Sequence, residues 1–170
     1  MVPCDPSCPP GSLRFVMYHY IREYDPAFPH LRFLDFEDFK QQLDHFERVY
    51  NFPTREQVVA YIRTPEAQVL NQGRPNMVLT FDDGLLDHYA FVLPELKRRD
   101  LWGIFYIPSG PYVNESMLDV HAVHALTARF DSATLLERAR ELIAGRMDAV
   151  FLDKQHEFEE HTYLPHFQTN

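Results

Sequence analysis

The sequence predicts an α/β fold built around a parallel sheet. Three short runs rich in strand-forming residues, at 13–20, 77–81 and 101–107, alternate along the chain with longer segments of helical periodicity. Such alternation is typical of parallel sheets, because each parallel connection needs a crossover segment that usually holds a helix. The chain has 170 residues, the length of one domain, and 45% of them are hydrophobic, which is enough for a packed core.

The first half of the chain predicts one strand and two helices. The run LRFVMYHY (13–20) follows Gly11 and precedes several prolines, so it is expected to be a buried strand. Asp35 is a candidate N-cap for a helix over FEDFKQQLDHFERVY, in which apolar residues recur every three or four positions. A second helix is expected after Thr54, with Gln57 placed as in a capping box.

The second half predicts two more strands and three helices. A turn at 71–76 precedes the strand MVLTF (77–81), which ends at Asp82, Asp83 and Gly84. The remaining expected elements are a helix over 86–99 with a kink at Pro94, a strand over 101–107, and helices over 119–128 and 132–145.

Polar or small residues follow each predicted strand. His19 follows the first strand, the two aspartates follow the second, and Ser109-Gly110 follows the third. Functional sites of parallel α/β folds gather at the carboxyl ends of strands, so a site is expected there. His19 is interpreted either as a residue that contacts substrate or as a hydrogen-bonded core histidine.

The Asp82-Asp83 pair is the strongest chemical signal in the sequence. Two adjacent carboxylates at the end of an apolar strand repel each other, and a divalent cation would remove that cost. Gly84 lets the chain turn sharply, so that one carboxylate can bind a metal while the other handles a proton. The alternative is an ordinary turn, because Asp-Asp-Gly is also a common turn sequence.

The residues around this pair resemble a known family. LTFDDG (79–84) resembles the first motif of the polysaccharide deacetylases, the NodB-homology group. VMYHYI (16–21), FEDFKQQLDHF and LPELKRRDLWGIFYIPSG (93–110) resemble neighbouring segments of the same family, in the same order. The resemblance implies a distorted (β/α) barrel and a metal-dependent hydrolase that removes N-acetyl groups from an amino-sugar polymer or oligosaccharide. It also implies that Asp82 is the catalytic base and that Asp83 binds a divalent metal, usually zinc.

The second motif of that family, His-Ser/Thr-x-x-His, supplies the other two metal ligands and has no clean match. One candidate is His121 with His124, which share a helical face but lack the Ser or Thr; His121 is the expected ligand. The alternative for this pair is packing against the sheet. The other candidate is His161 with His166, whose spacing of five and intervening Pro165 depart from the motif.

The later family motifs are also missing, so the sequence predicts an incomplete barrel. A complete one needs about 200 residues or more. The expected organisation is a disordered tail over 1–12 and a deacetylase-like domain over 13–170, truncated at its C-terminus, with exposed sheet edges. Two alternatives to an active enzyme follow: a non-catalytic relative that binds carbohydrate, or a truncated domain that is inactive on its own.

Composition limits the kinds of partner that are expected for this chain. A net charge of −9 argues against a nucleic-acid partner. Cys4 and Cys8 are interpreted as incidental residues of the tail, because no second cysteine pair would complete a zinc site. With no visible signal peptide and no apolar stretch of membrane-spanning length, a cytoplasmic location is expected unless the true start lies upstream.

A core or surface position is also expected for four further residues. Trp102, at the start of the third strand, is expected in the core. Three other histidines have no partner pattern and are expected at the surface: His30, His45 and His88.

Overall fold

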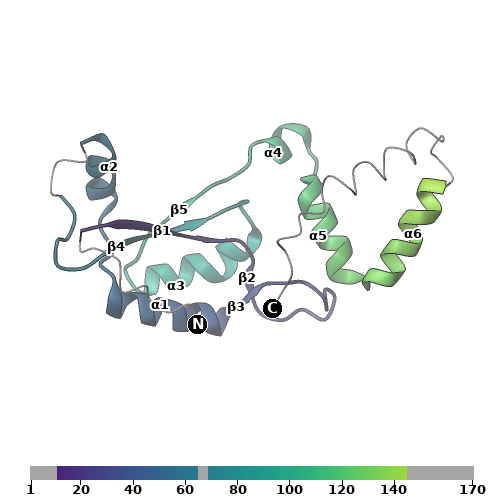
Figure 1. Ribbon diagram of the computed structural model, residues 1–170, viewed down its shortest axis with the longest axis horizontal. Helices are drawn as coiled ribbons and strands as arrows, with labels where there is room; N and C mark the ends of the chain where they lie inside the picture. The colour runs from purple at the N-terminus through teal and green to yellow at the C-terminus, as the bar shows by residue number, and fades with distance from the viewer. Residues whose placement is uncertain (1–10, 65–68, 145–170) are drawn as a thin grey trace, which may run out of the picture.

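The computed structural model describes residues 11–64 and 69–144. Its centre is a three-stranded parallel sheet in the order β1-β4-β5 (Figure 1), made of Leu13–Tyr18, Asn76–Phe81 and Gly103–Phe105. A second, two-stranded parallel sheet joins β2 (Ile21–Arg22) to β3 (Leu34–Asp35). The predicted α/β class with parallel strands is therefore confirmed. Over the described residues both sheets are open, and the barrel remains a prediction.

The register of the main sheet brings the three strand ends to one edge. Tyr18 pairs with Phe81, and Phe81 pairs with Phe105. The three rings stack in sequence, with centroid distances of 5.6 Å and 4.8 Å. Residues that follow β1, β4 and β5 therefore leave the sheet at the same edge, as expected for a parallel sheet.

The helices α1 (Phe36–Val49) and α3 (Leu93–Arg98) cover one face of this sheet (Figure 1). Phe39 and Leu43 of α1 are fully buried and join Leu96 of α3 in the main hydrophobic cluster. The predicted N-cap is confirmed, because the Asp35 side chain accepts a hydrogen bond of 2.8 Å from the backbone N–H of Glu37. This face therefore folds as the amphipathic pattern predicts.

The helix α2 (Arg55–Arg63) also begins as predicted. The Thr54 side chain accepts from the Gln57 backbone, and the Gln57 side chain accepts from the Thr54 backbone, which is a complete capping box. Only Val58 of this helix is buried.

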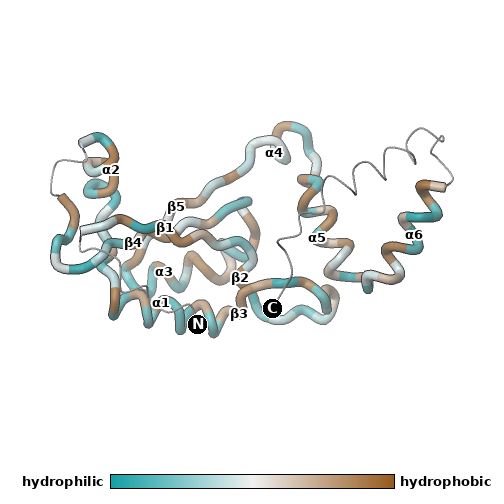
Figure 2. Tube along the Cα trace, in the orientation of Figure 1, coloured by the Kyte–Doolittle hydropathy of each residue, from teal (hydrophilic) through white to brown (hydrophobic). Residues whose placement is uncertain are grey.

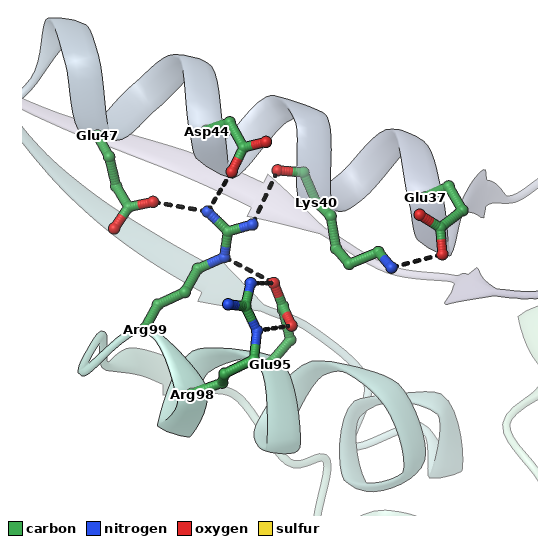
Figure 3. Close-up of polar contacts among 7 residues, drawn as sticks. All are labelled: Glu37, Lys40, Asp44, Glu47, Glu95, Arg98 and Arg99. Carbon is green, nitrogen blue, oxygen red and sulfur yellow. Dashed lines mark hydrogen bonds and ion pairs between the residues drawn. The ribbon is translucent and has the colours of Figure 1, made fainter.

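Polar side chains tie α1 to α3 (Figure 3). The Arg99 guanidinium donates to Asp44 and Glu47 of α1 and to Glu95 of α3, each over 2.6 Å. Arg98 also donates to Glu95, through Nε at 2.8 Å and Nη2 at 2.6 Å. The side chains of Glu95 and Arg99 are both buried, so this cluster replaces water for two desolvated charges.

The first strand is only partly buried, which corrects the expectation for 13–20. All six residues of β4 are buried, whereas Phe15 and Met17 of β1 are 52% and 60% exposed. The reason is position, because β4 lies between two strands and β1 lies at the edge of the described sheet. Hydropathy alone does not distinguish a central strand from an edge strand.

The helix predicted over 86–99 contains a π-helical turn before its proline. The segment η1 (His88–Val92) runs directly into α3, and the Leu93 backbone N–H donates to the carbonyl of His88, five residues back. Pro94 lacks an N–H and its ring would crowd the carbonyl four residues earlier. A wider turn relieves that crowding, so the expected kink takes the form of a π-bulge.

The last three described helices lie to one side of the sheet (Figure 1): α4 (Gly110–Asn114), α5 (Asp119–Arg129) and α6 (Ser132–Ala144). Two of them confirm the helices predicted over 119–128 and 132–145. Apolar segments recur along α5 and α6 (Figure 2). The exposed apolar residues of these helices include Val123, Leu126 and Leu136. None of the helices described is long and apolar enough to cross a membrane.

Candidate functional site

The Asp82-Asp83-Gly84 turn begins directly after β4. The Asp82 backbone N–H donates to the Tyr18 carbonyl over 2.9 Å, which continues the ladder to β1 by one bond. The chain then reverses through two left-handed residues, Asp83 with φ of 75° and Gly84 with φ of 60°. An added Cβ at Gly84 would lie 3.2 Å from Ile107 Cγ2, so both conformation and space favour glycine.

Three of the sequence-predicted site residues meet at the Asp83 carboxylate. The Nε2 atom of His121 lies 3.1 Å from Asp83 Oδ2, and the Nε2 atom of His19 lies 3.8 Å from the same oxygen. These side chains come from the turn after β4, from α5 and from the residue after β1. We call this group the Asp83 site.

The His121 contact with Asp83 is close but is not a hydrogen bond. His121 Nε2 is buried and has no hydrogen-bond partner among the described residues, although Oδ2 is within reach. Two ligand atoms at zinc-bond lengths around a tetrahedral ion would lie about 3.3 Å apart. The spacing of these two donors, and their identity as an imidazole and a carboxylate, therefore fit part of a zinc site.

The donor set is partial. Across residues 11–64 and 69–144, no group of three or more His, Cys, Asp or Glu side chains is arranged to hold a metal ion. Asp83 and His121 would supply two ligands, and a structural site needs four or a catalytic site three. The other histidine candidates, His161 and His166, lie outside the described residues, as do Cys4 and Cys8.

Asp82, the expected catalytic base, lies next to the Asp83 site in the chain. It is half-buried, and its carboxylate has no ion pair or side-chain hydrogen bond to the residues that the structure describes. A carboxylate with open acceptor capacity can take a proton from water.

Tyr20 holds α5 against the sheet edge, and the sequence interpretation missed it. Its hydroxyl hydrogen-bonds to His124 Nδ1 over 3.1 Å, and its ring lies edge-on to both His124 and His121 at 5.7 Å and 6.5 Å. Burial is the main cause that raises the pKa of Tyr20, and the nearby Asp83 charge adds to it. The neutral phenol can therefore hold His124 while His121 faces Asp83.

His121 and His124, which lie on one helix, therefore contact different partners. A shared metal would require both imidazoles to face the same point, but His124 contacts Tyr20 instead. The three-residue spacing correctly predicts that both histidines lie on one side of the helix. Which residues they contact there depends on how the helix packs against the rest of the chain.

Asp87 and Arg22 form a second polar pair, whose charges act on Tyr20. Arg22 Nε lies 3.8 Å from Asp87 Oδ2, and neither atom has a hydrogen-bond partner among the described residues. Burial raises the pKa of Asp87, and the Arg22 charge opposes that rise. The only sequence signal for this pair is a lone aspartate on an otherwise apolar helix face.

The surface prediction for His88 is wrong. His88 is 3% exposed, its ring packs against Phe81 and Phe105, and its Nε2 atom lies 2.8 Å from the His19 carbonyl oxygen. The physical reason is an unpaired backbone acceptor at the end of β1, which a buried imidazole satisfies. His30 is exposed as predicted, and His45 is half-buried.

His19 and Trp102 take intermediate positions. The His19 side chain is 40% exposed and contacts the Asp83 site, so its position favours the functional interpretation over a buried core histidine. Trp102 is half-buried, and its indole N–H donates to the Pro53 carbonyl over 2.8 Å.

Comparison with known proteins found similar solved structures, and no match of any other kind. No model of a protein family matches the sequence, and no curated protein does. Among solved structures, the chain is similar to the Streptococcus pyogenes deacetylase PplD in complex with acetate, at 27% identity and a TM-score of 0.49, over 63% of this chain and 47% of that one.

Two further solved structures are similar over part of their length. IcaB from Ammonifex degensii is 26% identical with a TM-score of 0.47, over 59% of this chain and 40% of that one. BC0361, a polysaccharide deacetylase from Bacillus cereus, is 22% identical with a TM-score of 0.36, over 51% of this chain and 24% of that one. The chain therefore spans less than half of each of these proteins.

Proposed function

We propose that this chain carries part of the active site of a metal-dependent hydrolase that removes N-acetyl groups from an amino-sugar polymer or oligosaccharide. The observation that carries the proposal is the approach of His121 Nε2 to Asp83 Oδ2 at 3.1 Å, without a hydrogen bond, beside the half-buried Asp82. An imidazole and a carboxylate that converge from distant segments are donors of the kind expected around a divalent cation.

Asp83 and His121 would hold the metal, and zinc is a divalent ion that accepts both oxygen and nitrogen donors. When bound, such an ion polarises the acetamide carbonyl and makes a water molecule more acidic. The left-handed backbone at Asp83 and Gly84 turns the chain directly after the strand. His19, 3.8 Å from the same oxygen, is suited to contact the substrate at the exposed side of the site.

Asp82 would act as the base. Its backbone N–H is fixed to β1, and its carboxylate is open to accept the proton of a water molecule. That water adds its oxygen to the acetamide carbon, the carbon–nitrogen bond breaks, and the proton passes from Asp82 to the departing amine. The products are acetate and the free amino sugar.

Release of acetate tests the proposal. We expect the zinc-loaded chain to release acetate from oligomers of N-acetylglucosamine, and Asp82→Asn to reduce the rate at least about a hundredfold, the size of a general-base contribution. Asp38→Asn is the matched control, because Asp38 is an exposed aspartate on α1. Equal rates in Asp82→Asn and the wild type would contradict the proposed base.

A non-catalytic carbohydrate-binding relative is the second candidate. It is favoured by the partial donor set, because the described residues supply two ligands and not three. Such a protein would bind the same oligomers and release no acetate, either with zinc or without it. The acetate assay therefore separates the two functions when saccharide binding is measured in parallel.

A further inference from the structure

A buried ion pair connects the two segments that follow β1 and β4. Arg22 belongs to β2, three residues after His19. Asp87 immediately precedes η1, four residues after Asp83, and is buried. Arg22 Nε lies 3.8 Å from Asp87 Oδ2. The pair therefore links the chain around one residue of the Asp83 site to the chain around another.

This ion pair contains no hydrogen bond. A separation of 3.8 Å exceeds the length of a hydrogen bond between nitrogen and oxygen, and neither Arg22 Nε nor Asp87 Oδ2 has another partner among the described residues. The Nη2 atom of the same guanidinium lies 3.9 Å from Asp25 Oδ2, in a more exposed position. Buried polar atoms without a partner cost free energy, and apolar residues of similar size often replace such a pair without loss of stability. Stability alone therefore does not explain these two charges.

His88, the residue after Asp87, makes a second contact with the segment after β1. Its Nε2 atom lies 2.8 Å from the His19 carbonyl oxygen. Two consecutive residues thus contact the segment 19–22 at its first and last positions. We call the contacts of Asp87 with Arg22 and of His88 with His19 the 87–88 clamp.

The segment that the 87–88 clamp holds carries two groups of the site. His19 lies 3.8 Å from Asp83 Oδ2, and the Tyr20 hydroxyl bonds to His124 of α5. The Tyr20 ring also lies edge-on to the His121 ring, with 6.5 Å between the centroids. A displacement of this segment would therefore move His19 directly and would disturb His121 through α5.

A buried ion pair fixes the relative position of two segments better than an apolar contact does. Hydrophobic contact is non-directional, whereas each buried charge is stabilised only where it lies beside its partner. Such a restraint matters for β2, which is two residues long and is not part of the main sheet. The hydrogen bonds between β1 and β4 therefore do not set the position of Arg22.

We propose that Arg22 and Asp87 are positioning residues, whose ion pair fixes the segment 19–22 against the rest of the Asp83 site. The pair acts through His19 and Tyr20 and touches neither substrate nor metal. This inference rests on the proposed function, because the site that the pair serves is the same one.

Zinc titration of the full chain by calorimetry tests the positioning role. Asp87→Asn retains the size of the side chain and removes its charge, so we expect zinc to bind about tenfold more weakly, as when a residue that orients metal ligands is lost. Asp87→Glu retains the charge and should recover part of the affinity. Glu95→Gln is the matched control, because it removes another buried carboxylate, in the cluster between α1 and α3, and should bind zinc as the wild type does.

A second measurement needs no metal. The rings of Tyr20 and His124 lie 5.7 Å apart between centroids, close enough for a nuclear Overhauser effect between their protons. We expect this signal in the metal-free wild type and in Glu95→Gln, and its loss in Asp87→Asn.

The double variant Arg22→Met with Asp87→Leu separates position from stability. Its unfolding temperature should equal or exceed that of the wild type, because an apolar pair replaces two poorly satisfied charges. Its zinc affinity should nevertheless fall about tenfold. This variant also decides the question if Asp87→Asn does not fold.

The outcomes distinguish the positioning role from the function on which it rests. Zinc binding by Asp87→Asn as tight as that of the wild type, an equal loss in Glu95→Gln, or a Tyr20–His124 signal that persists in Asp87→Asn would overturn the positioning role. Failure of the wild type to bind zinc would overturn the proposed metal site, and the Tyr20–His124 signal would then decide the positioning role by itself.

Discussion

The proposed chemistry depends on single residues at the end of β4. Asp83 adopts a left-handed backbone conformation that few non-glycine residues adopt, and it does so at the point where His19 and His121 converge. Strained backbone of this kind is concentrated at functional sites, since surrounding contacts must hold it in place. The conformation of Asp83 and its contacts are therefore parts of one arrangement.

Gly84 gives the first prediction. Gly84→Ala places a Cβ 3.2 Å from Ile107 Cγ2 on a backbone with φ of 60°. We expect a loss of about 1–2 kcal/mol in the free energy of unfolding, measured by urea denaturation. Gly73→Ala is the control, because Gly73 has no positive φ and an added Cβ there meets one contact at 3.4 Å. Equal effects of the two substitutions would refute the role given to the turn.

His88 gives the second prediction. His88→Leu leaves the His19 carbonyl without its 2.8 Å partner, whereas His88→Gln retains a side-chain donor. We expect the leucine variant to lose about 1–3 kcal/mol of stability, since the His19 carbonyl in this part-buried contact is left without its partner, and the glutamine variant to recover part of the loss. Thermal unfolding of both variants measures the difference, and a leucine variant as stable as the wild type would show that the contact contributes nothing.

At the scale of helices and strands, features with local causes could be predicted from the sequence, and long-range contacts could not. Local signals such as the Asp35 cap, the Thr54 capping box and the limits of β4 could be predicted because their causes lie within a few residues. The contacts of Tyr20, Asp87 and His88 could not be predicted, because each partner comes from a segment brought near by a parallel crossover. The Asp83–His121 contact was predicted only through the family resemblance.

The α1–α3 cluster gives a prediction about elements and pH. Hydrogen bonds from Arg98 and then Arg99 lower the pKa of Glu95 to about 2, against the opposing effect of burial. A lowered folded-state pKa stabilises the protein above the unfolded value of 4.5, and this stabilisation is lost as the pH falls from there toward about 2. The cluster therefore contributes to stability at neutral pH and not in strong acid.

Glu95→Gln tests that contribution. We expect a loss of about 2 kcal/mol in the free energy of unfolding near neutral pH, and a smaller loss near pH 3, where the wild-type carboxylate begins to take up a proton. Glu37→Gln is the control, because Glu37 is exposed and pairs only with Lys40 in the described structure. A loss that is the same at both pH values would contradict the assignment of Glu95.

At the scale of the whole molecule, apolar surface is the main consequence of an open sheet. Phe15 and Met17 are exposed on β1, and Val123, Leu126 and Leu136 are exposed on α5 and α6. Exposed apolar residues on an edge strand favour association. We expect the purified chain to associate as concentration rises, and Phe15→Ser with Met17→Ser to reduce this in sedimentation experiments. A monodisperse wild type at all concentrations would contradict the expectation.

Zinc titration by calorimetry is the measurement that tests the central claim most directly, namely that Asp83 and His121 form part of a metal site. We predict micromolar or tighter binding to the wild type, weakened at least about tenfold in Asp83→Ala and in His121→Ala. His45→Ala, which removes a histidine from α1, should bind as the wild type does. Binding that is unchanged in both site variants, or no binding by the wild type, would contradict the claim.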